Sequence, residues 1–111
     1  MKIFDLRKAA LESEEGETVL GARQTGSHAC YMIYGRLAPG EEGRLVRPGA
    51  GHEEIVLSAK GGLSVSGYFT GMLPEGSALH LSGDQECRLE NPGETDAVYI
   101  IAGGHAEGGH H

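Results

Sequence analysis

The sequence lacks any long hydrophobic run. No segment approaches the ~20 consecutive apolar residues of a membrane-spanning helix. The first 17 residues, MKIFDLRKAALESEEGE, also lack the apolar centre of a secretory signal. These absences argue against a membrane protein and against a secreted one, so we expect a cytoplasmic protein.

Positive charge and cysteine are also scarce. The chain has 9 Lys and Arg residues against 16 Asp and Glu residues, which gives a formal net charge of −7. Such a chain repels nucleic-acid phosphates and anionic lipid headgroups, so neither nucleic acid nor a membrane surface is an expected partner. The two cysteines, Cys30 and Cys87, do not make a disulfide framework, and both are expected to be free thiols.

Glycine, by contrast, is abundant. It accounts for 19 of the 111 residues, more than twice the average share of ~7%. The glycines separate short segments rich in β-branched, aromatic and other apolar residues, which is typical of strands joined by turns. The predicted strands cover residues 18–20, 29–37, 44–48, 53–59, 63–69, 77–81, 86–91 and 97–103. This spacing predicts a single all-β domain, either a sandwich or a barrel.

One segment has a helical pattern. In residues 5–15, Leu6, Ala9 and Ala10 lie on one side, which predicts a short helix or an extended arm, with helix confined to the first 16 residues. The expected organisation is an N-terminal arm with the first strand in residues 1–25, a barrel in residues 26–103, and a flexible tail rich in His and Gly in residues 104–111.

Several residues fall at the spacing of two known motifs. Glu54 is followed by six residues and then Gly61, which matches the end of G(X)5HXH(X)3-4E(X)6G. The spacing of G(X)5PXG(X)2H(X)3N is matched by Gly76, Ser82, Asp84, Cys87 and Asn91. Through these residues the segment 30–103 resembles the cupin superfamily. The resemblance implies a small double-stranded β-helix, also called a jelly-roll barrel.

The resemblance also implies where a cupin metal would bind, and the chain departs from that pattern at three of the four ligand positions. The two His positions of the first motif hold Arg47 and Gly49, or Pro48 and Ala50 at the shorter spacing, and the His position of the second motif holds Cys87. Of the four ligand positions, only the glutamate position holds its standard residue, Glu54. We therefore expect no standard high-affinity cupin metal site.

His52 suggests a different set of metal ligands. Residues 52 and 54 point to the same side of an extended strand, so both His52 and Glu54 could face the barrel interior, and Cys87 would add a thiolate. Imidazole, carboxylate and thiolate suit a divalent transition metal such as Zn, Fe, Mn or Ni. The competing interpretation, which we prefer, places His52 in a turn at the barrel mouth, where it binds no metal.

Arg47 admits two roles. Its guanidinium can pair with Glu54 and neutralise the buried carboxylate, or it can hold the carboxylate of a ligand in bidentate fashion. We prefer the internal ion pair. Under either interpretation the candidate pocket residues are Arg47, His52, Glu54 and Cys87.

The other histidines lie away from this pocket. Alternation along residues 77–81 predicts that His80 points outward. His105, His110 and His111 lie within seven residues at the end of the chain. Such tracts bind Ni, Zn or Cu loosely. The alternative is that they belong to a purification tag.

Two classes of function remain open. The first is a non-catalytic module that binds a small molecule in the barrel through a degenerate metal site. The second is a metal-dependent cupin enzyme of the oxygenase, isomerase or lyase type. The missing metal ligands favour the first class. The resemblance further implies a homodimer, and residues 29–37 carry apolar side chains on both faces of their strand, so one face is available for a partner.

Overall fold

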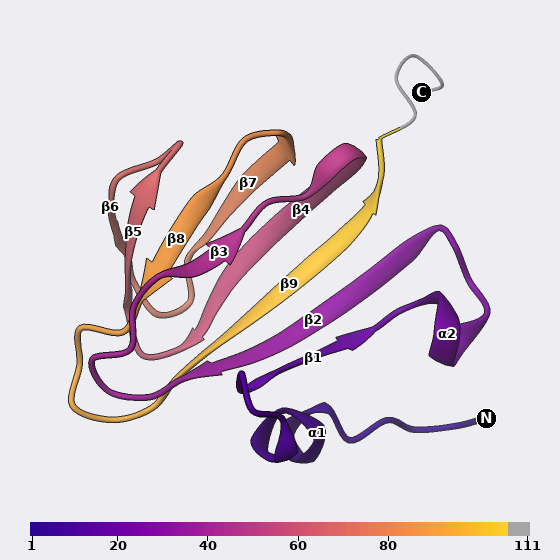
Figure 1. Cartoon of the computed structure of the whole chain (residues 1–111), viewed down its shortest axis with the longest axis horizontal. Helices are drawn as coiled ribbons and strands as arrows, with labels where there is room; N and C mark the ends of the chain where they lie inside the picture. The colour runs from indigo at the N-terminus through magenta and orange to yellow at the C-terminus, as the bar shows by residue number, and fades with distance from the viewer. Residues whose placement is uncertain (107–111) are drawn as a thin grey trace.

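Two antiparallel sheets make up the protein in the computed structural model, which describes residues 1–106 (Figure 1). The five-stranded sheet runs in the order β1 (Glu17–Leu20), β2 (Cys30–Leu37), β9 (Ala97–His105), β4 (Gly49–Lys60) and β7 (Ala78–Gly83). The four-stranded sheet runs in the order β3 (Arg44–Val46), β8 (Cys87–Glu90), β5 (Leu63–Gly67) and β6 (Gly71–Leu73). From β4 onward the chain crosses repeatedly between the sheets, with β5 and β6 forming a hairpin within one of them, and this is the jelly-roll arrangement that the motif spacing implied.

The core lies between the two sheets. In the middle of β4 and the first half of β9, every second residue is buried, because alternate side chains of a strand point to opposite faces. The buried cluster consists of Leu37, Val46, Val56, Leu63, Val65, Leu73, Leu81, Cys87, Leu89, Ala97, Tyr99 and Ile101. Both sheets contribute to it, so the hydrophobic contact between them holds the barrel together.

The predicted helix near the N-terminus is confirmed as α1 (Leu6–Glu12), which begins where the Asp5 carboxylate accepts the Lys8 amide hydrogen at 3.0 Å. The restriction of helix to the first 16 residues is wrong. A short second helix, α2 (Ala22–Thr25), follows β1. The Gln24 side chain accepts the Gly21 amide hydrogen at 2.9 Å, and Gly26 ends the turn in a left-handed conformation with φ 78°.

Two further differences concern the strands. Residues 70–76, expected to be a turn, include the edge strand β6, which pairs with β5. β9 continues through Gly104 to His105, both of which the sequence had placed in the tail, because they pair with Glu53 and His52 of β4. Of the other tail histidines, His110 and His111 lie outside the described residues. Within residues 1–106, no helix is long and apolar enough to cross a membrane.

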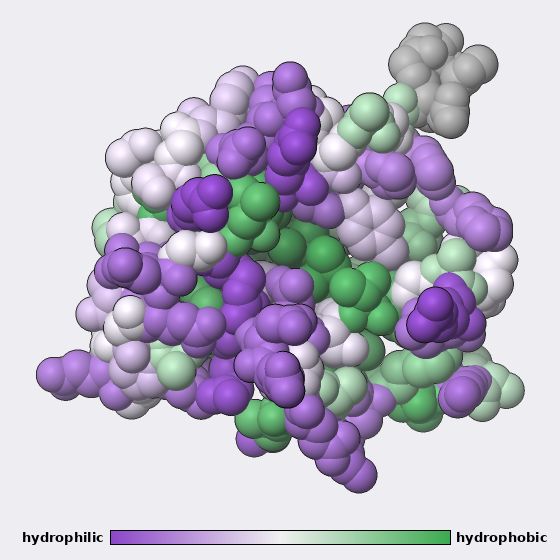
Figure 2. All heavy atoms as spheres, viewed as in Figure 1, coloured by the Kyte–Doolittle hydropathy of each residue, from purple (hydrophilic) through white to green (hydrophobic). Residues whose placement is uncertain are grey.

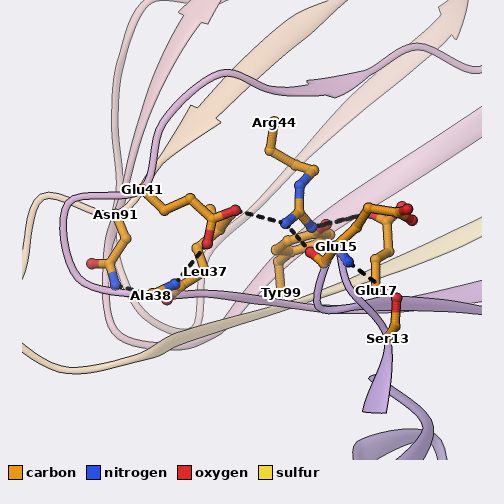
Figure 3. A network of polar contacts seen from close by, with 9 residues as sticks. All are labelled: Ser13, Glu15, Glu17, Leu37, Ala38, Glu41, Arg44, Asn91 and Tyr99. Carbon is orange, nitrogen blue, oxygen red and sulfur yellow. Dashed lines mark hydrogen bonds and ion pairs between the residues drawn. The ribbon is translucent and has the colours of Figure 1, made fainter. Parts of the chain in front are cut away.

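One half-buried arginine ties the N-terminal arm to the barrel (Figure 3). Arg44 of β3 donates to the Tyr99 hydroxyl at 2.5 Å, to the Glu15 carbonyl oxygen, and to the Glu41 carboxylate at 3.0 Å. The Tyr99 hydroxyl donates in turn to Glu17, whose carboxylate lies 3.6 Å from the Arg44 guanidinium. These contacts join the arm, β3 and β9.

The motif asparagine, Asn91, has a structural role. It is 2% exposed, and its amide donates to the Leu37 and Thr95 carbonyl oxygens at 3.0 and 2.8 Å while its oxygen accepts the Gly93 amide hydrogen at 2.9 Å. The side chain therefore holds the turn before β9 against the end of β2.

We expect Asn91→Ala to lower the free energy of unfolding by about 2–3 kcal/mol, because it leaves buried carbonyl groups without donors. Urea unfolding followed by circular dichroism measures this loss. Asn91→Asp keeps the acceptor oxygen but removes the two donated bonds, so it should be at least as destabilised as the alanine variant. Wild-type stability in the aspartate variant would contradict this assignment.

Candidate ligand-binding site

A buried carboxylate marks one end of the barrel interior. Glu54 lies on β4, faces the core together with Val56, and is 5% exposed. The Tyr31 hydroxyl of β2 donates to its Oε2 atom. Burial raises the pKa of Tyr31, and the hydrogen bond and charge of Glu54 raise it further. Tyr31 therefore keeps its proton at neutral pH, and its hydroxyl donates a hydrogen bond to the carboxylate.

Tyr31 reaches Glu54 by crossing the strand that lies between them. Tyr31 is paired directly with Gly103 of β9, and a Cβ atom on Gly103 would overlap the tyrosine ring. The other end of the same pair of strands repeats the arrangement, where Tyr99 of β9 lies across Gly35 of β2 and donates to Glu17. Each tyrosine thus carries its hydroxyl over a glycine to a carboxylate.

Two histidines lie next to this carboxylate. His52 of β4 is half-buried and is paired directly with the exposed His105 of β9, and their ring centroids are 4.8 Å apart. The Tyr31 ring meets His52 edge-on at 6.0 Å. Of the predicted residues, the structure therefore brings His52 and His105, the latter predicted as a metal ligand of the tail, close to Glu54, and it adds Tyr31.

Arg47 does not join this group. It is exposed, follows the end of β3, and forms no ion pair among residues 1–106. The expected ion pair between Arg47 and Glu54 is therefore not formed. The Tyr31 hydroxyl donates to the carboxylate instead, because the tyrosine reaches it across Gly103 of β9.

Cys87 lies in the opposite sheet. It is 1% exposed, belongs to the hydrophobic core, pairs with Val46 of β3, and its thiol lies 3.9 Å from the Phe69 carbonyl oxygen. It also borders a hollow lined by Ser66, Gly67, Glu86 and Arg88, away from Glu54. Cys87 thus behaves as a small apolar side chain.

A metal at the cupin positions does not fit these residues. Of Arg47, Gly49, Glu54 and Cys87, only the last two are ligand types, and Cys87 is committed to the core. In the part of the chain that the structure describes, no three His, Cys, Asp or Glu side chains converge on one point. The alternative set of His52, Glu54 and Cys87 is therefore not brought together.

The outer face of the five-stranded sheet carries other predicted features. His80 points outward, as expected, and contacts Glu53 at 2.7 Å. Met32 and Ile55 are 38% and 51% exposed on the same face. An apolar outer face is compatible with pairing of two copies, but the homodimer stays a prediction.

The contact of Tyr31 with Glu54 and the pairing of His52 with His105 were not predicted from the sequence. Alternation along residues 29–37 was visible, but whether Tyr31 or Met32 faces the interior depends on the register with β9. The signal was a glycine at 103 opposite a tyrosine at 31, and it can be recognised only once β2 and β9 are known to pair.

No protein-family model and no curated protein matches the chain. Solved structures do match it. The protein TT1209 from Thermus thermophilus has a TM-score of 0.69 and 19% identity, over 95% of this chain and 98% of that one. An RmlC-like cupin from Shewanella frigidimarina has a TM-score of 0.60 and 16% identity, over 74% of this chain and 71% of that one.

An oxalate oxidase has a TM-score of 0.69 and 18% identity over 85% of this chain, but only 53% of that protein is covered. The chain likewise covers 60% of peruvianin-I, a cysteine peptidase from Thevetia peruviana latex, at a TM-score of 0.71 and 14% identity over 80% of this chain. At these identities the common feature is the fold. This chain therefore has the cupin fold, as its motif spacing predicted.

Proposed function

We propose that this cupin-fold protein binds a small polar molecule at the open end of the barrel, with the Glu54 carboxylate as the main anchor. The proposal rests on one observation, the unequal hydrogen bonding of the two Glu54 carboxylate oxygens. Oε2 accepts from Tyr31, while Oε1 accepts no hydrogen bond from residues 1–106 and is not among the buried unpaired atoms, so it still has accessible surface. Because Glu54 as a whole is only 5% exposed, little water reaches this oxygen, and a ligand that donates a hydrogen bond to it would bind favourably.

The chemistry around Glu54 defines the ligand class. The carboxylate accepts hydrogen bonds, and the Tyr31 oxygen can accept one more after donating to it. No basic side chain forms an ion pair with Glu54 within residues 1–106. The site therefore favours a ligand rich in donors, such as a primary amine or a polyol, over the carboxylate compound that Arg47 would have suited.

The surface also carries apolar regions. Figure 2 shows a recessed hydrophobic stripe across the middle of the face viewed in Figure 1, with hydrophilic residues on both sides. A separate apolar hollow, lined by Leu20, Cys30, Met32 and Ala102, lies on the outer face of the five-stranded sheet, opposite to Glu54. The proposed site therefore depends on the polar groups around Glu54.

A comparison of two neighbouring glutamates tests the proposal. In a thermal-shift screen of small amines, amino acids and polyols, we expect at least one class to stabilise the wild-type protein. At a concentration about 100 times its Kd, the gain is about 2.7 kcal/mol, or several degrees in Tm. Glu54→Gln should lose most of this gain, because it removes the charged acceptor.

Glu53→Gln is the matched control, because Glu53 lies on the same strand but its side chain contacts His80 on the outer face. It should keep the ligand-induced shift. Tyr31→Phe should keep the fold and weaken the shift, since it removes the hydroxyl that orients Glu54. If no compound stabilises the wild type, or if both glutamine variants respond like the wild type, the proposal is wrong.

The alternative function, a metal-dependent enzyme with His52, Glu54 and Cys87 as ligands, receives no support from the geometry. Such an enzyme needs its ligands to converge on one metal ion. Here Cys87 packs in the core of the opposite sheet.

A further inference from the structure

We propose that His52 and His105 form a two-histidine site for a divalent late transition metal ion at the open end of the barrel. The two residues face each other directly on neighbouring antiparallel strands, β4 and β9. Their ring centroids lie 4.8 Å apart with an interplanar angle of 35°. Imidazole nitrogens suit Ni²⁺, Zn²⁺ and Cu²⁺.

The separation of the rings agrees with shared coordination. A metal–nitrogen bond of about 2.0–2.1 Å, added to about 1.1 Å from that nitrogen to the ring centre, places a metal about 3.2 Å from each centroid. For N–metal–N angles between about 90° and 109°, two such rings lie roughly 4.5–5.2 Å apart. The observed 4.8 Å falls inside this range.

The hydrogen bond made by His52 leaves its Nε2 atom free to bind a metal. Its Nδ1 atom lies 3.1 Å from the Ala50 carbonyl oxygen. A carbonyl oxygen can only accept, so Nδ1 carries the proton and Nε2 keeps its lone pair for a metal. A hydrogen bond from the other ring nitrogen is what usually orients a histidine ligand. His105 is exposed at the end of β9, so its ring can turn toward the ion.

This site differs from the cupin metal positions and from the proposed ligand anchor. It uses none of Arg47, Gly49, Glu54 or Cys87, and water can fill the remaining coordination positions. Loss of Glu54 should therefore leave metal binding in place, and loss of His105 should leave the Glu54 anchor in place. The two proposals can fail separately.

The test is isothermal titration calorimetry with Ni²⁺ on the full-length chain. The parent protein carries His110→Ala and His111→Ala, which remove the terminal histidines, and Cys30→Ser, which removes the exposed thiol opposite Gly104. We expect about one equivalent of Ni²⁺ to bind. His52→Ala and His105→Ala should each weaken binding by about tenfold or more, because each leaves a single imidazole.

His80→Ala is the matched control, because His80 is an exposed histidine on β7 outside the pair, and it should bind like the parent. Circular dichroism checks that every variant is folded. As a second measurement, Ni²⁺ should raise the Tm of the parent but not that of either variant of the pair. Parent-like binding by His105→Ala, or no difference between the parent and the variant lacking both His52 and His105, would overturn the proposal.

Discussion

Replacing Gly35 by alanine is expected to lower the free energy of unfolding by about 3 kcal/mol or more. The ring of Tyr99 lies directly over Gly35, and an added Cβ atom would overlap it. Tyr99 is completely buried, so its ring has no open space to move into. Any displacement also breaks the hydrogen bonds of its hydroxyl with Glu17 and Arg44.

Gly62→Ala is the matched control for this substitution. A Cβ atom at Gly62 would meet its nearest neighbour, the Met72 side chain, at 3.6 Å, which is an ordinary contact. Urea unfolding of both variants should therefore show a large loss of stability for Gly35→Ala and a small change for Gly62→Ala. Equal stabilities would mean that Tyr99 can repack without cost and that the contact between tyrosine and glycine does not define the core.

The fold was predictable because its signals are local. Glycine-rich turns and alternating strands come directly from neighbouring residues, and Glu54, Gly61 and Asn91 were placed by motif spacing alone. α2 was missed because its four residues depend on a side-chain contact between Gln24 and Gly21 rather than on an apolar periodicity.

The site was harder to predict because it depends on register. The sequence identified Glu54 as an inward carboxylate, but its partner comes from a strand 23 positions away in sequence. Arg47 was preferred because it stands at a ligand position of the first motif and is opposite to Glu54 in charge. The His52–His105 pair needed two facts that only the structure supplies: that β9 continues to His105, and that it pairs there with β4.

The second large expected effect is a loss of stability in alkaline solution. Burial raises the pKa of Tyr99 above its usual value near 10, and the hydrogen bond to Glu17 and the charge of Glu17 add to the shift, while Arg44 opposes it. Burial and Glu54 raise the pKa of Tyr31 in the same direction. Both tyrosines therefore hold their protons more tightly in the folded protein than in the unfolded chain.

The sign of the effect follows from proton binding. Below pH ~10 the tyrosines are protonated in both states, and their contribution to stability is fully present. Above that pH the unfolded chain loses these protons while the folded protein keeps them, so the free energy of unfolding falls. For the buried Tyr99 the slope approaches about 1.4 kcal/mol per pH unit, and for the less buried Tyr31 it is smaller because solvent screens the charges.

Urea unfolding between pH 8 and about 11 measures this slope and separates the tyrosines from other groups that titrate. Tyr99→Phe fills nearly the same volume and leaves the Arg44–Glu17 contact of 3.6 Å in place, so it should fold with reduced stability at pH 8 but lose less stability as the pH rises.

Asn91→Ala is the control, since it is also destabilised but keeps both hydroxyls, and its slope should equal that of the wild type. A Tyr99→Phe variant that loses stability as steeply as the wild type would show that Tyr99 releases its proton equally easily in the folded and unfolded states, and that its hydrogen bond to Glu17 does not hold the proton.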